Sequence, residues 1–364
     1  MHRIVYLFFI FTLTTFAQES PRYQYSVDAN YYYGNILKHS DAIAPLIKGH
    51  PDGFLLSINR KTFGHKAWES RYNYPDYGIS LHYEDMKNEV LGKNYGAYLH
   101  YNFYFFQRNL MLRIGQGVAY TTNPYDAVTN PENVAYGTHW MPTTYFLLNF
   151  KKENLWNGFG VQAGVSFFHH SNANLRSPNT STNTIAFNVG AIYTINTDET
   201  PEYIKNTDTV RFTQPLKYNL VFRTGVNESD LIGAGQLPFY VYSGFVDKRI
   251  NRKSALQIGA DYFVMKYLQD TVDRIVVDNP NGKVKSDTDY KKIGVFVGHE
   301  LFINHLSVET QIGYYAYRPL DYLDPIYQRI GAKYYFGETI FAEVSLKTHA
   351  AKAEAIEFSL GIRL

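Results

Sequence analysis

The sequence predicts an all-β fold, a transmembrane antiparallel up-and-down β-barrel of about 12 to 16 strands, with sixteen the best count. Two observations carry this prediction. Apolar and polar residues alternate repeatedly over segments of about 10 to 13 residues, which is typical of strands with one face on lipid and the other on a polar interior. The composition agrees, because 33 Tyr and 25 Phe accompany a negative mean hydropathy of -0.30. Composition alone would fit a soluble β-sandwich equally well.

The alternation is clearest in the first and last predicted strands. One face of the first strand carries Tyr23, Tyr25, Val27, Ala29, Tyr31 and Tyr33. One face of the last strand carries Ile356, Phe358, Leu360, Ile362 and Leu364, and the other carries Glu357, Ser359, Gly361 and Arg363. A chain that ends on such a strand resembles the outer-membrane insertion signal, so we expect the barrel-assembly machinery as a partner.

The pattern predicts sixteen strands, an even number as single-chain bacterial barrels prefer. Their ranges are 23–33, 53–62, 76–85, 94–106, 110–121, 142–151, 157–170, 183–195, 216–227, 236–248, 254–267, 290–302, 305–318, 326–337, 339–349 and 354–364.

The connections between these strands alternate in length. Short connections would be periplasmic and long ones extracellular, as in outer-membrane barrels. The long extracellular loops are predicted at 34–52, 122–141, 171–182 and 268–289. Two connections break the pattern, because 63–75 and 196–215 are long and would be periplasmic.

The start of the chain predicts export. Residues 1–17 combine a basic start, an apolar run and a small residue at Ala17, which is typical of a cleaved secretory signal peptide. No later segment approaches the about 20 apolar residues that a spanning helix needs. We therefore expect 18–364 to form a single barrel domain in the outer membrane of a Gram-negative-type envelope.

Composition also excludes several kinds of chemistry. The chain has no cysteine, which rules out disulfides, thiol catalysis and cysteine metal sites. The net charge is only +2, with no long basic run, so nucleic acid is not an expected partner.

One strand carries a group of residues suited to catalysis. Side-chain parity in 157–170 places His169 and Ser171 on the lipid-facing side, where polar residues are costly and suggest function. His170 faces the interior, so the two histidines cannot share a metal ion, and no metal site is expected. If the 171–182 loop closes symmetrically, Asn183 lies opposite His169 within hydrogen-bonding reach. These three residues supply a nucleophile, a base and an orienting group.

The same residues carry a family resemblance. His169-His170-Ser171-Asn172-Ala173, then Pro178-Asn179 and Asn183, resembles the His-x-Ser-Asn-Ala…Pro-Asn signature of the lipid A 3-O-deacylase (PagL-type) outer-membrane barrels. The resemblance implies an esterase that removes the 3-position acyl chain of lipid A, or lipopolysaccharide, in the outer leaflet without a cofactor. It implies Ser171 as nucleophile, His169 as base, and Asn172 with the Ala173 amide as the oxyanion-stabilising region.

The sequence departs from that family in two respects. The acidic third member of the family's triad falls at Asn183, and the chain is about twice the length of the small eight-stranded members. Asn183 can still accept the Nδ1 proton and fix the imidazole tautomer, but it lacks the charge that stabilises an imidazolium.

Other interpretations remain open. A porin or small-solute channel needs the same barrel without a nucleophile, and sixteen strands would leave an aqueous lumen. A purely structural barrel has no positive feature. In the loops, Asn179 is interpreted as a turn residue and the cations as solvated, namely Arg176, Lys283 and Lys285. Three residues of the 122–141 loop are candidates for the missing carboxylate or a substrate contact: Asp126, Glu132 and His139.

Overall fold

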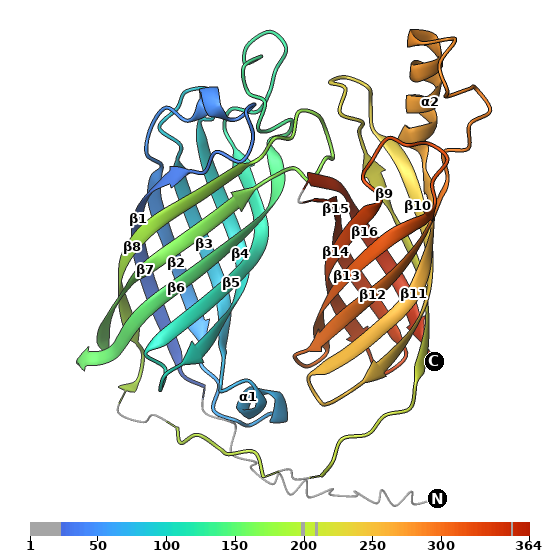
Figure 1. Ribbon diagram of the computed structural model, residues 1–364. Coiled ribbons are helices and arrows are strands. Elements are labelled where there is room, and N and C mark those ends of the chain that lie inside the picture. The colour runs from blue at the N-terminus through green and yellow to red at the C-terminus, as the bar shows by residue number, and fades with distance from the viewer. Residues whose placement is uncertain (1–22, 198–200, 208–209, 351) are drawn as a thin grey trace, which may run out of the picture.

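The computed structural model describes residues 23–197, 201–207, 210–350 and 352–364, so the predicted signal peptide, residues 1–17, lies outside the described part. Within it, sixteen antiparallel strands close into two barrels of eight strands each (Figure 1). The first barrel contains β1 (Tyr25–Ile36), β2 (Asp52–Arg60), β3 (Asp76–Asp85), β4 (Lys93–Phe105), β5 (Leu110–Thr121), β6 (Trp140–Trp156), β7 (Phe159–His170) and β8 (Thr182–Thr194). The second contains β9 (Lys217–Asn227), β10 (Leu237–Arg249), β11 (Ser254–Met265), β12 (Lys292–Phe302), β13 (Leu306–Tyr317), β14 (Ile326–Phe336), β15 (Ile340–His349) and β16 (Lys352–Arg363).

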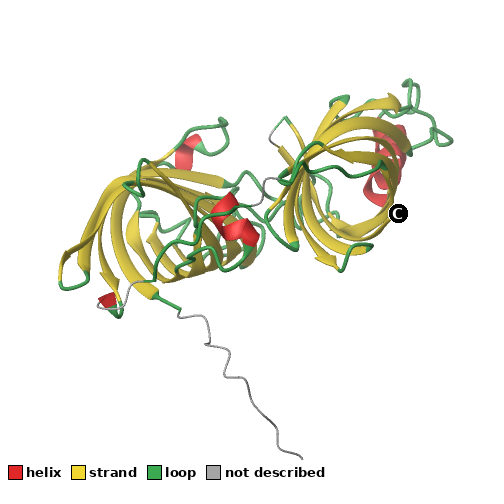
Figure 2. Ribbon diagram, turned by 90° about the horizontal axis from the view of Figure 1, so that it is seen from below, coloured by secondary structure: helices red, strands yellow, loops and turns green. Residues whose placement is uncertain are grey.

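The division into two barrels corrects the expectation of one barrel domain over 18–364. Strand β8 returns to β1, with Ala191 opposite Ala29, and β16 pairs with β9, with Leu360 opposite Phe222. Figure 2 shows the two barrels as separate rings that lie side by side. The all-β class and the strand count are confirmed. Alternation could not reveal the second closure, because a strand that closes a ring has the same pattern as any other.

The two long connections that broke the length pattern now have an explanation. Both lie at the end of the barrels with the short turns (Figure 1). The first contains the short helix α1 (Ala67–Arg71), and the second, after β8, is the linker that joins the two barrels. A linker between closed barrels has no reason to be short.

The opposite end carries the long loops, including the 3₁₀ turn η1 (Ala44–Leu46) and the helix α2 (Lys266–Asp278). The sequence prediction placed a loop over most of α2. Its buried residues Leu268 and Val272 are four apart and pack in the core of the second barrel, so the helical spacing was present in the sequence. None of the helices in the described residues is long and apolar enough to cross a membrane.

Side chains fill the interiors of both barrels. In the first, Arg113 pairs with Asp28 at 2.7 Å and both are buried. In the second, Arg329 pairs with Asp261 at 3.0 Å and with Glu357 at 2.5 Å. Eight strands enclose a space that side chains can fill, unlike the sixteen of a porin. The lumen expected from a single sixteen-stranded barrel therefore does not form.

The outer faces are apolar. Every second residue of β16 points outward, and Phe358, Leu360 and Ile362 are exposed, whereas Glu357 and Arg363 point inward and are buried. The predicted parity of this strand is therefore confirmed, and the same alternation surrounds both barrels.

Candidate active site

The candidate site lies at the long-loop end of the first barrel, where β7 and β8 are joined by residues 171–181. His169 stands opposite Asn183 in the register of the two strands, as the sequence predicted. Nδ1 of the half-buried His169 lies 2.7 Å from Oδ1 of Asn183. With Oδ1 as acceptor, Nδ1 carries the proton and Nε2 holds the free lone pair that a base requires.

His170 points the other way, into the barrel. It is fully buried, with Nε2 2.9 Å from Glu84 Oε2 and Nδ1 2.9 Å from Thr143 Oγ1. The two adjacent histidines therefore belong to separate environments, one on the barrel wall and one inside the barrel.

Ser171 follows directly after β7 and is buried. Its hydroxyl donates to Asn179 Oδ1 at 3.1 Å and accepts from the Ala173 N–H at 3.0 Å. In the described part of the chain, no hydrogen bond joins Ser171 to His169. Asn179 Oδ1 also accepts from the Asn172 N–H at 3.0 Å, so its interpretation as a simple turn residue missed two contacts in the centre of the motif.

The backbone after Ser171 turns tightly. Ala173 and Asn174 adopt φ values of 53° and 63°, a left-handed conformation that is uncommon for residues other than glycine. The buried Asn172 braces this turn, because its Nδ2 donates to the Arg176 carbonyl at 2.6 Å and its Oδ1 accepts from the Asn174 N–H at 3.0 Å. The predicted oxyanion region is thus a turn with its own internal hydrogen bonds.

The second barrel holds this turn through the loop that follows β9. The carboxylate of the buried Glu228 accepts from the Ser177 N–H and from the Gly235 N–H, both at 2.7 Å. The backbone of Glu228 exchanges hydrogen bonds with Asn174, from Glu228 N to the Asn174 carbonyl at 3.1 Å and from Asn174 Nδ2 to the Glu228 carbonyl at 2.8 Å. Ser177 Oγ donates to the Ser229 carbonyl at 2.7 Å. Sequence analysis gave Glu228 no role, because it lies outside the alternating segments.

The first barrel supports the other side of the 171–181 loop. Thr180 N and Ser181 N donate to the carbonyls of Val134 and Ala135 at 3.0 and 3.2 Å. Gly137 packs so closely that a Cβ atom there would lie 2.4 Å from the Arg176 carbonyl oxygen. The loop is therefore held between the two barrels.

The structure separates the remaining loop candidates from His169. Asp126, Glu132, His139 and Arg176 surround one cavity of about 960 Å³. Asp126 accepts from the backbone N–H groups of Val128 and Thr129, and His139 stacks on Tyr120 with ring centroids 5.1 Å apart. Within the described residues, none of the four has a hydrogen bond to His169. The side chains of Arg176, Lys283 and Lys285 are exposed, consistent with their interpretation as solvated cations.

The comparisons with known families divide the chain as the structure does. Residues 52–191 match the family described as "Lipid A 3-O-deacylase (PagL)", and residues 216–364 match "Acyloxyacyl hydrolase, C-terminal domain". Together the matches cover most of the chain. The chain belongs to the lipid A 3-O-deacylase (PagL) family. This explains its length, because the first match falls in the first barrel and the second spans the second barrel.

Solved structures with similar strands are outer-membrane proteins, although overall similarity is low. A mutant of the Rh. blastica porin is 10% identical, over 94% of this chain and 99% of its own, with a TM-score of 0.19. Pseudomonas aeruginosa OccK2 in complex with glucuronate is 12% identical, over 94% and 95%, with a TM-score of 0.23. The Acinetobacter baumannii outer membrane protein Omp33 is 8% identical, over 94% and 97%, with a TM-score of 0.18. No curated protein matches. Family membership and the barrel fold make this an outer-membrane β-barrel protein.

Proposed function

We propose that this protein is an outer-membrane esterase that removes the ester-linked acyl chain at the 3-position of lipid A by serine catalysis. One observation carries the proposal. His169 and Asn183 lie opposite each other on β7 and β8 with Nδ1 and Oδ1 2.7 Å apart, and the next residue but one after His169 is the buried Ser171. A serine, a histidine and an amide that orients the histidine are the parts of a nucleophilic hydrolase.

The reaction begins when Ser171 exchanges its partner. In the proposed mechanism the Ser171 hydroxyl leaves Asn179 and turns to Nε2 of His169, so that its hydrogen bonds to a neutral amide and to the Ala173 N–H are lost. His169 takes the hydroxyl proton as Oγ attacks the ester carbonyl carbon. The tetrahedral intermediate expels the sugar oxygen, which receives that proton, and leaves an acyl-enzyme. Water, activated by His169, then releases the fatty acid.

Asn172, Ala173 and Asn183 have supporting roles in this proposal. Asn183 keeps the proton on Nδ1 of His169, so that Nε2 is basic. The Ala173 N–H is released when Ser171 rotates and becomes a donor for the oxyanion. Asn172 maintains the turn that presents this amide. No step requires a metal or an organic cofactor.

The position of the site suits a lipid substrate. Strand β7 rises from Phe159 at the short-turn end, and a barrel strand crosses the hydrocarbon region in about 9–11 residues. His169 therefore lies near the outer interface, at the depth of the acyl esters of an outer-leaflet lipid. Lipid A or lipopolysaccharide can reach the barrel wall by lateral diffusion.

We also propose that the second barrel positions the catalytic turn. Glu228 and Ser229 hold Asn174 and Ser177 through four hydrogen bonds across the two barrels. Catalytic rates are sensitive to displacements of about 1 Å in the reacting groups, so a turn that is held in place should give a faster reaction than a mobile one. Glu228 is in this view a positioning residue, since it contacts the loop and not the reacting atoms.

Mass spectrometry of lipid A tests the catalytic proposal. Cells that express the wild type are expected to lose one ester-linked acyl chain from lipid A, whereas cells that express Ser171→Ala retain it. Ser286→Ala, which changes an exposed serine in a second-barrel loop, is the matched control and should act as the wild type. Heat-modifiable migration in gels verifies that each barrel folds. Identical lipid A from wild type and Ser171→Ala, with both folded, would overturn the proposal.

We further propose that β16 is the strand that the barrel-assembly machinery recognises. Its outward-facing Phe358, Leu360 and Ile362 support this, because they form the regular apolar face of an insertion signal. Leu360→Asp should reduce the amount of folded protein in the outer membrane, while Ser359→Ala, which changes an inward-facing residue, should not. Equal membrane levels of the two variants would contradict this assignment.

A further inference from the structure

The outer wall of the second barrel contains a groove that faces the membrane. It has a volume of about 610 Å³ and crosses the strands from β11 to β15. Four outward-facing apolar side chains line it, one from each strand from β11 to β14: Leu256, Val297, Ile312 and Ile330. Each of the four is more than half exposed, so the groove is open to the lipid that lies against the wall.

Four polar side chains form a line along the same groove. They are His299, Thr310, Gln328 and Thr348. His299 stands opposite Thr310 on β12 and β13. Gln328 stands opposite Thr348 on β14 and β15, and it is a diagonal neighbour of Thr310, which faces Ile330 two residues along β14. Polar side chains on a lipid-facing wall are costly and suggest function, and here they gather in one place.

The side-chain amide of Gln328 is oriented by its neighbours. Its Oε1 accepts hydrogen bonds from the Thr348 hydroxyl at 3.2 Å and from the Ala350 N–H at 3.1 Å. These donors fix the carbonyl end of the amide, so Nε2 is the end that remains for a ligand. Within the described residues Nε2 has no acceptor, and the half-buried side chain lines the groove. An amide donor that faces hydrocarbon without an acceptor is unfavourable.

The imidazole of His299 also has no hydrogen-bond partner in the part of the chain that the structure describes. The Thr310 hydroxyl donates to the His299 carbonyl at 3.2 Å, which satisfies the threonine but leaves the ring unpaired. The ring is half-buried on the lipid-facing side of β12. A ligand that presents only hydrocarbon would leave both the imidazole and Gln328 Nε2 without partners. The groove therefore fits a chain that carries oxygen atoms at more than one position.

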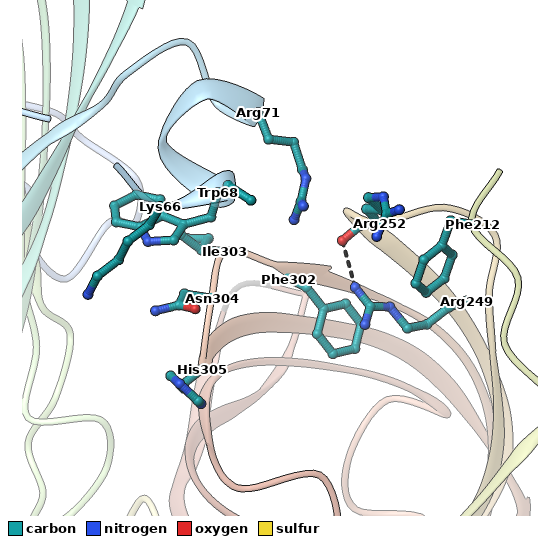
Figure 3. Close-up of a pocket in the computed structure, with 11 residues that line it drawn as sticks. Lys66, Trp68, Arg71, Phe212, Arg249, Arg252, Phe302, Ile303, Asn304 and His305 are labelled. Atoms are coloured by element: carbon teal, nitrogen blue, oxygen red, sulfur yellow. Dashed lines mark hydrogen bonds between the residues drawn. The ribbon is translucent and has the colours of Figure 1, made fainter. Parts of the chain in front are cut away.

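The groove differs in chemistry from the cavities at the two ends of the molecule. The cavity in Figure 3, of about 440 Å³, lies at the short-turn end and is lined by cations such as Lys66 and Arg71. The cavity of about 960 Å³ beside Asp126 lies among the long loops. Among the outward-facing residues described along the groove there is no lysine, arginine, aspartate or glutamate. Its ligand is therefore uncharged where it touches the wall.

The groove runs inward from the outer interface of the membrane. Strand β14 begins at Ile326 on the long-loop side, so Gln328 lies near the outer interface. His299 lies deeper, because β12 runs the other way and ends at Phe302 on the short-turn side, three positions later. A lipid of the outer leaflet has the same arrangement, with carbonyl groups near the interface and hydrocarbon below them.

We propose that this groove binds an acyl chain of lipid A. The carbonyl oxygen of the chain accepts a hydrogen bond from Gln328 Nε2, a further oxygen on the chain meets His299, and the hydrocarbon lies over Val297 and Ile312. Acyl chains of lipid A carry hydroxyl or ester oxygens besides the carbonyl, whereas those of ordinary phospholipids do not. The volume of the groove is within the range of ligand sites, about 300–1,000 Å³. This inference requires a membrane-spanning barrel but not the deacylase activity.

Lipid that remains bound to the full-length protein tests the groove. The protein is purified from outer membranes in mild detergent, and native mass spectrometry counts and identifies the lipids that it retains. Retention of lipid A is the expected result. Phospholipid in place of lipid A would overturn lipid A as the occupant. A lipid-free dimer would overturn the proposal as well, because a second copy of the chain would then cover the wall.

Three variants make the test specific to the groove. Thr310→Trp fills it, and Gln328→Leu and His299→Leu each remove a polar partner of the chain. Each should reduce the retained lipid A about tenfold, the equivalent of one hydrogen bond in an apolar setting. Ala332→Trp adds the same ring to the same wall outside the groove, and Thr224→Val removes a lipid-facing hydroxyl elsewhere on the barrel, so both are matched controls.

Two readings keep this test separate from the proposed catalysis. Heat-modifiable migration verifies that each variant folds, and deacylation of lipid A should remain at the wild-type level in all of them, because the first barrel is unchanged. Wild-type retention of lipid A in all three groove variants, or an equal loss in the two controls, would overturn the groove as the binding site. Neither result would bear on the role of Ser171.

Discussion

Replacing Glu228 with glutamine tests whether the second barrel fixes the geometry of the Ser171 turn. The carboxylate accepts two backbone N–H groups, from Ser177 and Gly235, both at 2.7 Å. Glutamine keeps one acceptor oxygen but turns an amino group toward the other N–H. The substitution therefore removes one charge-assisted hydrogen bond and leaves a buried donor without a partner.

The magnitude follows from the number of bonds. A hydrogen bond to a charged group contributes about 1.5–3 kcal/mol. The turn after Ser171 can be pictured in two states, one bonded to Glu228 and one released from it. Each 1.4 kcal/mol changes the equilibrium between them by about a factor of ten. A loss of this size therefore lowers the ratio of bonded to released turn by about 10- to 100-fold. Glu228→Ala loses both bonds and should be more impaired than Glu228→Gln.

The assay is the rate of fatty-acid release from lipid A in mixed micelles by the purified full-length protein. We expect Glu228→Gln to lower kcat about 10- to 100-fold without changing the thermal unfolding of the strands. Glu338→Gln, which changes an exposed acid in the β14–β15 turn at the opposite end, is the control. A kcat for Glu228→Gln within twofold of the wild type would refute the positioning role of the second barrel.

Three further substitutions test other parts of the structure. Asn183→Asp supplies a charge beside His169 and should raise kcat about tenfold, because a charge-assisted hydrogen bond is about twice as strong as a neutral one. A fall in kcat would contradict the orienting role of Asn183. Gly137→Ala places a methyl group against the loop backbone and should lower kcat about tenfold or more, with an unchanged urea midpoint. A kcat equal to that of the wild type would contradict the role of this contact in holding the loop. Arg113→Met leaves Asp28 buried without its partner and should lower the free energy of unfolding of the first barrel in urea by about 3–5 kcal/mol. An unchanged urea midpoint would show that the ion pair contributes little to stability.

The strands could be predicted because side-chain alternation reports a physical constraint that acts on every residue. A residue in a barrel wall faces either lipid or the interior, so the predicted ranges 76–85 and 110–121 coincide with β3 and β5. The same rule placed His169 opposite Asn183, since parity fixes the face and a symmetric loop fixes the register. The closure into two rings was beyond this rule, because alternation carries no information about which strand lies at the end of a ring.

The surroundings of Ser171 could not be predicted for a related reason. Residues 171–181 have no periodicity, and their conformation depends on contacts with distant segments. Asn179 is eight residues from the Ser171 that it binds, and Glu228 is 51 residues from Ser177. A left-handed Ala173 also has no sequence signal of the kind that a glycine gives. Local patterns therefore identified the motif but not the state in which its serine rests.

The two barrels are tied together at both ends, and this bears on why the second one is present. At the long-loop end the tie is Glu228 to the turn after Ser171, and at the short-turn end it is Tyr72 to Phe302. If the barrels were joined at one end only, they could rotate relative to each other. Such a rotation would move the turn after Ser171, which is bonded to the second barrel, away from His169, which lies in β7 of the first barrel. With both ends joined, a rotation must break hydrogen bonds at one end or the other. Side chains pack the interior of the second barrel, so it can act as a rigid support for the turn after Ser171, which lies outside the strands.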